Sequence, residues 1–154
     1  TYHLQHCSLY KILSVSLYLL DTNSISEMRK AKQGKASSSF IQWADSVDDA
    51  TLCTCAVVMM ELERGVLGME RKDPAQGLHL RRWLDGTIKP LFADRILPID
   101  EDTAAICARL HVPDRSPEND AWIAAIAIQH HLTIVTRNVA DFAESGAKLL
   151  NPFE

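Results

Sequence analysis

The feature that most constrains the fold is an alternation of short apolar runs with longer helical segments. Strand-like runs are expected at residues 16–21, 50–55, 95–99, 132–136 and 148–150. Helical patterns are expected between them, at residues 37–47, 57–69, 73–92, 101–110 and 117–131. Strands that alternate with helices form βαβ units, in which the strands run parallel. We therefore predict an α/β fold with a central parallel β-sheet flanked by helices on both faces.

The chain of 154 residues suits one domain rather than two. We expect residues 17–154 to form that domain. The apolar run at residues 12–20 is too short to span a bilayer as a helix, and no small-residue cleavage site follows it. We therefore expect neither a signal peptide nor a membrane segment, and a cytoplasmic protein. Residue 1 is not Met, and residues 1–16 are interpreted as a non-native or disordered extension.

The formal net charge of −4 argues against a protein that binds nucleic acid through a broad basic face. Contact with phosphate would need a local basic patch or a metal ion. The stretch RKAKQGK (29–35) is interpreted as an exposed loop, either an ordinary turn or a contact for RNA phosphates. The cysteines lack the spacings of a zinc site and are expected to be small core residues in a reducing compartment.

Two acidic residues follow predicted strands. Asp21 comes directly after the first apolar run, with Thr22 and Asn23 next to it, and Asp141 follows the run at 132–136 across a short loop. In open parallel sheets, ligands bind beyond the carboxyl ends of the strands. Each acid also has a simpler interpretation, because Asp21 can cap the helix after it and Asn138 can form a cap with Asp141.

Two more acidic residues lie in apolar helices. Glu61 falls within VVMMEL (57–62), and Asp120 precedes AWIAAIAI (121–128), which is apolar on every face and must be buried. A buried carboxylate is costly unless it is paired, hydrogen-bonded or bound to a metal. Alternatively, Glu61 can pair with Arg64 one turn on, and Asp120 can stabilise the first turn of a helix that begins near Pro117.

The four acids can meet at one end of the predicted sheet. Carboxylates that lie close together raise one another's pKa values, and a hard divalent cation relieves this repulsion. Mg²⁺ and Mn²⁺ prefer oxygen ligands, and such an ion can activate water and stabilise charge on a phosphate. The chemistry that this pattern favours is phosphodiester hydrolysis.

At these residues the sequence resembles the PIN-domain family and, within it, the VapC-type toxins, including the FitB-like branch. The matching stretches are YLLDTNSISEMRK (18–30), MMELERGVLG (59–68), LFADRILPIDEDTAAICARL (91–110) and NDAWIAAIAIQHHLTIVTRNVADF (119–142). They follow the order found in the family and cover nearly everything after residue 17.

The resemblance implies a catalytic, Mg²⁺- or Mn²⁺-binding set and a group of supporting residues. The metal and catalytic set comprises Asp21, Glu61, Asp120 and Asp141. The supporting residues are Thr22, Asn23, Thr136 and Asn138. The loop at 111–119 is shorter than in many relatives, so departures from the family are expected at the substrate-facing rim rather than at the metal site.

The resemblance also implies a function, a metal-dependent endoribonuclease that is the toxin of a toxin–antitoxin system. Its partners would be the RNA substrate, a second copy in a homodimer, and a cognate antitoxin with a DNA-binding domain, with which the toxin can form a larger hetero-oligomer. Such an antitoxin can place an Arg among the acids in place of the metal ion. Two alternatives are a housekeeping RNA-processing nuclease without an antitoxin and a catalytically inactive PIN-like binding module. The presence of all four acids argues against the inactive module.

Overall fold

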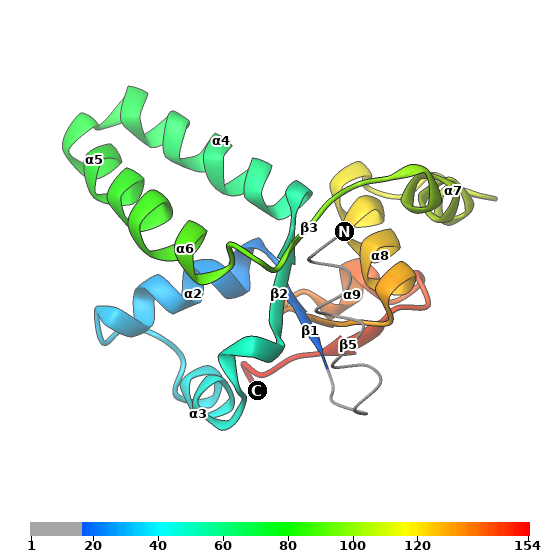
Figure 1. The fold of residues 1–154 in the computed structure, drawn as a ribbon, viewed down its shortest axis with the longest axis horizontal. Helices are drawn as coiled ribbons and strands as arrows, with labels where there is room; N and C mark the ends of the chain where they lie inside the picture. The colour runs from blue at the N-terminus through cyan, green and yellow to red at the C-terminus, as the bar shows by residue number, and fades with distance from the viewer. Residues whose placement is uncertain (1–16) are drawn as a thin grey trace.

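The computed structural model describes residues 17–154, which form a five-stranded parallel sheet with helices on both faces (Figure 1). The strands are β1 (Tyr18–Leu20), β2 (Leu52–Cys55), β3 (Ile96–Leu97), β4 (Thr133–Val135) and β5 (Lys148–Leu150). Their order across the sheet is β3-β2-β1-β4-β5, and every pairing is parallel. The predicted fold class is confirmed. The expectations for residues 1–16 lie outside the described residues.

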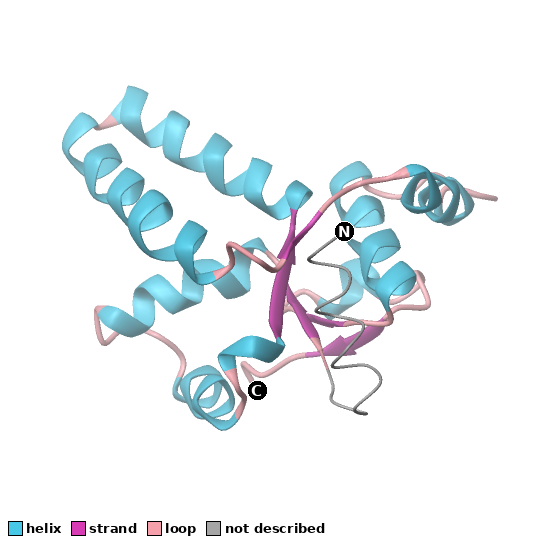
Figure 2. Ribbon diagram, viewed as in Figure 1, coloured by secondary structure: helices cyan, strands magenta, loops and turns pink. Residues whose placement is uncertain are grey.

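The helices cover both faces of this sheet, as Figure 2 shows with helices in cyan and strands in magenta. Their bounds are α2 (Thr22–Lys32), α3 (Ser38–Ser46), α4 (Ala56–Lys72), α5 (Pro74–Trp83), α6 (Lys89–Leu91), α7 (Glu101–Leu110), α8 (Glu118–His130) and α9 (Val139–Phe142). Helices α2 to α6 lie on one side of the sheet, and α7 and α8 lie on the other (Figure 1). Within residues 17–154, none of the helices has the length and apolar character that crossing a bilayer requires.

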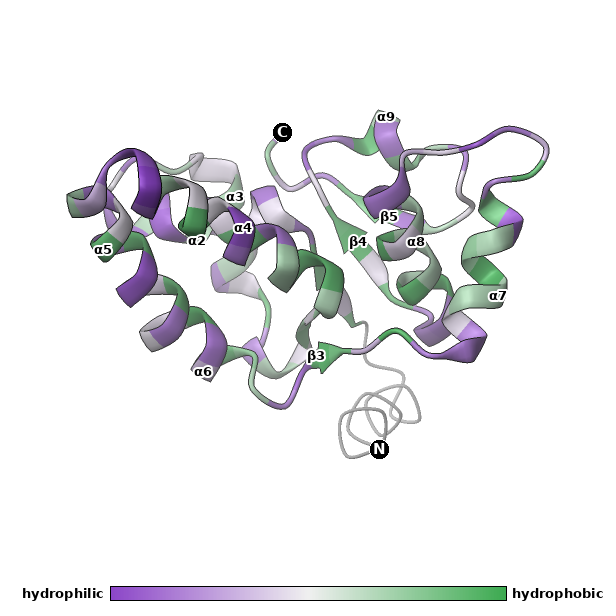
Figure 3. Cartoon of the chain, turned by 90° about the horizontal axis from the view of Figure 1, so that it is seen from above, coloured by the Kyte–Doolittle hydropathy of each residue, from purple (hydrophilic) through white to green (hydrophobic). Residues whose placement is uncertain are grey.

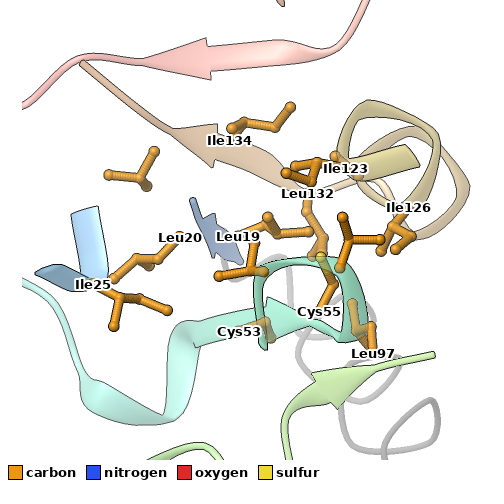
Figure 4. Close-up of a cluster of buried hydrophobic side chains, with 14 of the residues drawn as sticks. Leu19, Leu20, Ile25, Cys53, Cys55, Leu97, Ile123, Ile126, Leu132 and Ile134 are labelled. Atoms are coloured by element: carbon orange, nitrogen blue, oxygen red, sulfur yellow. The ribbon is translucent and has the colours of Figure 1, made fainter. Parts of the chain in front are cut away.

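The core is built around the central strands, which are buried on both faces. All four residues of β2 are buried, as are Leu19 and Leu20 of β1. Figure 4 shows these leucines between Ile25 of α2 and Ile126 of α8. Parallel strands covered by helices on both sides are apolar along their whole length, which explains the continuous apolar runs in the sequence. The predicted burial of the helix after Asp120 is also confirmed.

The prediction of a loop at 29–35 was wrong for residues 29–32, which are helical, whereas residues 33–35 lie in the turn that follows the helix. Helix α2 continues to Lys32, and Arg29, Lys30 and Lys32 form its last turn. Cationic side chains interact favourably with the carboxyl end of a helix dipole. Lys30 also lies one turn from the buried Glu27, with 3.8 Å between Nζ and Oε2. The cluster of positive charge therefore ends a helix rather than interrupting one.

Two expected elements differ in detail. Residues 50 and 51 belong to a short 3₁₀ turn, η1 (Asp49–Thr51), because the Asp48 side chain accepts a hydrogen bond from the Ala50 amide. The expected helix at 73–92 contains a π-helical segment, η2 (Leu84–Ile88), between α5 and α6. Its two end residues are fully buried, so the wider turn keeps both leucine and isoleucine side chains in the core.

Candidate active site

Asp21 lies where β1 ends and α2 begins, at the carboxyl edge of the sheet. Its amide donates to the Val135 carbonyl at 3.3 Å, and its Oδ1 accepts from the Ser24 amide at 2.9 Å. Only 6% of the residue is exposed, and the Thr136 side chain is also hydrogen-bonded to its carboxylate. Burial raises the pKa of Asp21, although the hydrogen bonds from Thr136 and Ser24 oppose that change. Asp21 therefore caps a helix and also carries a carboxylate at the sheet edge.

Glu61 lies in the second turn of α4, the helix that follows β2. The Thr22 hydroxyl donates to its Oε1 at 2.8 Å, and the Asn119 amide group donates to its Oε2 at 3.5 Å. Residues from α2 and α8 thus hold the two oxygens of a side chain from α4. The alternative pairing with Arg64 is absent from the ion pairs of the described residues.

Asp120 lies in the first turn of α8, as expected, because Pro117 occupies the N-cap position. Its pKa is raised, first by burial and then by the negative charges of Asp141, Glu61 and Asp21. Asp120 therefore lies near enough to each of the other three predicted acids to sense its charge. Asp141 itself is exposed and lies in the short helix α9.

The predicted supporting residues fall into two groups. Thr22 and Thr136 contact the acids directly, and Thr136 is fully buried. Asn23 and Asn138 are exposed, and within residues 17–154 neither side chain is hydrogen-bonded to an acid of the set. The Asn138 side chain does not cap α9. The Asn138 backbone carbonyl instead accepts a hydrogen bond from the Asp141 amide at 3.0 Å.

Two residues that hold the acids were not predicted from the sequence. Ser24 donates its amide to Asp21, and its hydroxyl donates to the Val135 carbonyl at 2.8 Å. Asn119 contacts Glu61 across the space between two helices. Ser24 stands three residues after Asp21, where a capping side chain finds its donor, so this contact had a sequence signal. The Asn119 contact joins residues 58 positions apart and had none.

The donor chemistry of the four acids fits a hard divalent cation, since all four offer carboxylate oxygens. As the side chains are placed, no group of three His, Cys, Asp or Glu within residues 17–154 is close enough to hold an ion directly. Mg²⁺ commonly takes only one or two carboxylates and keeps several waters. The arrangement therefore suits an ion held partly through water rather than one enclosed by protein ligands.

Comparison with known proteins identifies the family. The PIN domain model matches residues 18–146. Toxin FitB of Neisseria gonorrhoeae is 34% identical over 142 residues, covering 89% of this chain and 99% of FitB. VapC ribonuclease Y4jK of Sinorhizobium fredii is 31% identical over 143 residues, covering 90% of this chain and 99% of that protein. The structure of FitAB bound to an IR36 DNA fragment matches with a TM-score of 0.76 and 30% identity, covering 90% of this chain and 96% of that one.

The chain belongs to the PIN-domain family, as a toxin ribonuclease of the VapC/FitB type. The family and the ribonuclease class predicted from the sequence are thus confirmed.

Proposed function

We propose that Asp21, Glu61, Asp120 and Asp141 bind Mg²⁺ or Mn²⁺, and that the protein uses this site to hydrolyse phosphodiester bonds within RNA. The proposal is supported by the positions of the four acids, three on helices α4, α8 and α9 and one between β1 and α2, and by the effect of the other three charges on Asp120. None of the ion pairs in the described part of the chain supplies a cation to them. Such a cluster needs positive charge from outside the chain.

The residues around the acids keep them oriented before RNA binds. Ser24 and Thr136 fix the Asp21 carboxylate, and Thr22 and Asn119 fix that of Glu61. Asp141 is exposed and so faces the side from which a phosphate can approach. A bound divalent cation would supply the charge that acidifies water and stabilises the phosphate in the transition state. Because these hydrogen bonds fix the carboxylates in advance, less reorganisation of the site is needed when the transition state forms.

The same proposal includes a cognate antitoxin with a DNA-binding domain. Its support is the relative FitB, which is named a toxin, and the FitAB complex, which was solved on DNA. An antitoxin Arg placed among the acids would supply the missing positive charge and block the site. We also propose that the toxin is a homodimer, as the family resemblance implies.

The test is cleavage of labelled single-stranded RNA by the purified protein with Mg²⁺, with Mn²⁺ and with EDTA. We expect cleavage with either ion and none with EDTA. Asp21→Asn should abolish cleavage and keep the fold, because an Asn oxygen still accepts from the Ser24 amide. Asp94→Asn, at an exposed acid in the turn after α6, is the matched control and should cleave like the parent. Undiminished cleavage by Asp21→Asn would refute the proposed site.

A further inference from the structure

Two cations from different parts of the chain meet at one buried carboxylate, that of Glu27 on α2. Only 5% of the Glu27 side chain is exposed. Its Oε2 atom lies 3.8 Å from Lys30 Nζ and 3.6 Å from Arg137 Nη2. Its Oε1 atom accepts a hydrogen bond from the Ser37 amide at 2.9 Å. Both oxygens of the acid therefore have partners within the chain, and the cation pair, Lys30 and Arg137, shares a single negative charge.

The cation pair is open to solvent, although the carboxylate beneath it is not. Lys30 is 53% exposed and Arg137 is 50% exposed. The Arg137 guanidinium packs over the Phe153 ring, with 4.2 Å between Cζ and the ring centroid. Phe153 in turn stacks on Phe40, with 5.0 Å between the ring centroids. Because the guanidinium is already held at Glu27 and on Phe153, it loses little conformational freedom when it binds an anion.

The cation pair lies close to the candidate acids without belonging to them. Asp21 caps the start of α2, and Glu27 follows six residues later, about 9 Å further along the helix. Arg137 comes directly after Thr136, whose side chain is hydrogen-bonded to the Asp21 carboxylate. In Figure 3, α2 lies with α3 to α6 on one side of the molecule, and α7 to α9 lie on the other. The contact between Arg137 and Glu27 thus joins α2 to the segment that leads from β4 to α9.

The acids around the cation pair leave it with a net positive charge. Among the ion pairs of residues 17–154, Glu27 is its only acidic partner. Glu154 is exposed and forms no ion pair in the described part of the chain. Asp45 lines a groove together with Lys32. Lys32 stands two positions from Lys30 and so faces a different side of α2. The cation pair is therefore suited to binding an anion.

We propose that the cation pair binds a backbone phosphate of the RNA substrate, a few nucleotides at most from the cleaved bond, and that Glu27 is the positioning residue for both cations. The inference rests on the proposed function, because it adds a contact for the same RNA. The four acids repel a polyanion, so RNA held beside them needs positive charge elsewhere on this edge of the sheet. Phosphates recur at every nucleotide, so one strand can occupy the acidic site and the cation pair together.

RNA binding without cleavage tests the cation pair directly. The Asp21→Asn chain, which the proposed function predicts not to cleave, is titrated with a fluorescently labelled single-stranded RNA in Mg²⁺ at several salt concentrations. Adding Lys30→Gln or Arg137→Gln should raise Kd about fivefold at low salt. Either change should also reduce the slope of log Kd against log salt by about 0.7, the value for one phosphate contact on a single strand.

Lys32→Gln is the matched control, because it removes the same charge from the same turn of α2. In the Asp21→Asn chain it should leave Kd and the slope nearly unchanged. Arg137→Lys, which keeps the charge, should keep the slope. A purely structural role of the cation pair would lower the melting temperature of the Gln variants and leave the slope as it was. Lys30→Gln changes an exposed residue at the helix end, so it provides the test even where Arg137→Gln does not fold.

The outcomes distinguish this inference from the proposed function. If the parent cleaves RNA and EDTA stops it, but Lys30→Gln and Arg137→Gln have the slope of Lys32→Gln, the inference fails and the proposed function stands. If both variants instead weaken binding of a labelled Glu-rich peptide without changing the slope for RNA, the cation pair belongs to a protein partner, which also overturns the inference. If the parent shows no metal-dependent cleavage, the proposed function fails, and the contact inferred for its substrate fails with it.

Discussion

Two glutamates on the same helix, two residues apart, meet opposite surroundings. Glu63 accepts from Arg81 and from Lys89, each at 2.8 Å, and these partners, Lys89 first, lower its pKa. Glu61 accepts from the neutral groups of Thr22 and Asn119. Helix α4 therefore separates a region where the chain neutralises its own acids from one where it does not. The acids of the first region are paired with cations of the chain, whereas the proposed function supplies the second region with a cation from solution.

The neutralised region joins the helices from α4 to α6, which project from the sheet in Figure 1. Arg81 contacts Glu63, Glu70 and Asp85, and Lys89 also contacts Asp85 at 2.8 Å. Lys89, followed by Arg81, lowers the pKa of Asp85. At the sheet edge the effect has the opposite sign, because burial raises the pKa values of Asp21 and Asp120. The pKa values of Asp21 and Asp120 thus change in the opposite direction from those of Glu63 and Asp85.

The largest effect is expected from exchanging each glutamate for glutamine. Glu61→Gln should lower RNA cleavage at least about 100-fold, because an ion site contributes several kcal/mol of transition-state stabilisation. Glu63→Gln should cleave RNA like the parent. Turnover of one RNA oligonucleotide by the three proteins is the measurement. Equal losses in both variants would show that the two regions do not differ as described.

A smaller effect is expected from Gly77→Ala, which tests how closely α4 and α5 must approach. A Cβ at Gly77 would lie 2.4 Å from the backbone Cα of Glu70, so the helices would have to separate. Overpacking of this kind typically costs about 1–3 kcal/mol of the free energy of unfolding. Gly68→Ala on α4, where a Cβ meets nothing within 4 Å, should instead stabilise by up to about 1 kcal/mol. Chemical unfolding of both variants checks the pair, and a neutral Gly77→Ala would contradict the close approach.

The smallest effects are expected in the pH dependence of stability without metal. The pKa of Asp120 is raised on folding, so the free energy of unfolding falls as pH rises from the ordinary Asp pKa through the raised value. Asp120→Asn should remove this decline and be no less stable than the parent at neutral pH in EDTA. The pKa of Glu63 is lowered, so its contribution is present above the ordinary Glu pKa and disappears as pH falls through the lowered value.

Glu63→Gln should therefore destabilise at neutral pH, by no more than about 1 kcal/mol, because the group is partly exposed. Urea unfolding of the two variants and the parent in EDTA, from about pH 2 to about pH 7, measures both changes. A marked destabilisation of Asp120→Asn at neutral pH would show that this charge is compensated within the chain.

Much of the fold was predictable because its signals are local. Apolar runs marked every strand of the described sheet, and the start of α8 followed from Pro117. Local patterns gave a wrong prediction where polar composition favours a loop but helix propensity favours a helix. The basic residues of 29–32 read as a loop by composition, yet they are good helix formers at a favourable helix end. The π-helical segment at 84–88, whose end residues are buried, was not predicted from the sequence.

The candidate site was predictable for a different reason. All four acids were noticed because an acid that follows or lies within an apolar run has few explanations, and the family resemblance then implied the same set. Contacts between distant elements were not predictable from one sequence. The bonds from Thr22 and Asn119 to Glu61, and those from Arg81 to Glu63, depend on how helices pack. The sequence therefore indicated the acids but not which of them are neutralised.

The most direct test of the contrast is Mn²⁺ binding, measured by electron paramagnetic resonance without RNA. The parent should bind Mn²⁺, and Asp120→Asn should lose most of that binding, because Asp120 senses the charge of all three other acids. Asp85→Asn, at an acid already paired with Lys89 and Arg81, should bind like the parent. Mn²⁺ binding that persists unchanged in Asp120→Asn would contradict the central claim that the four acids form one divalent-cation site.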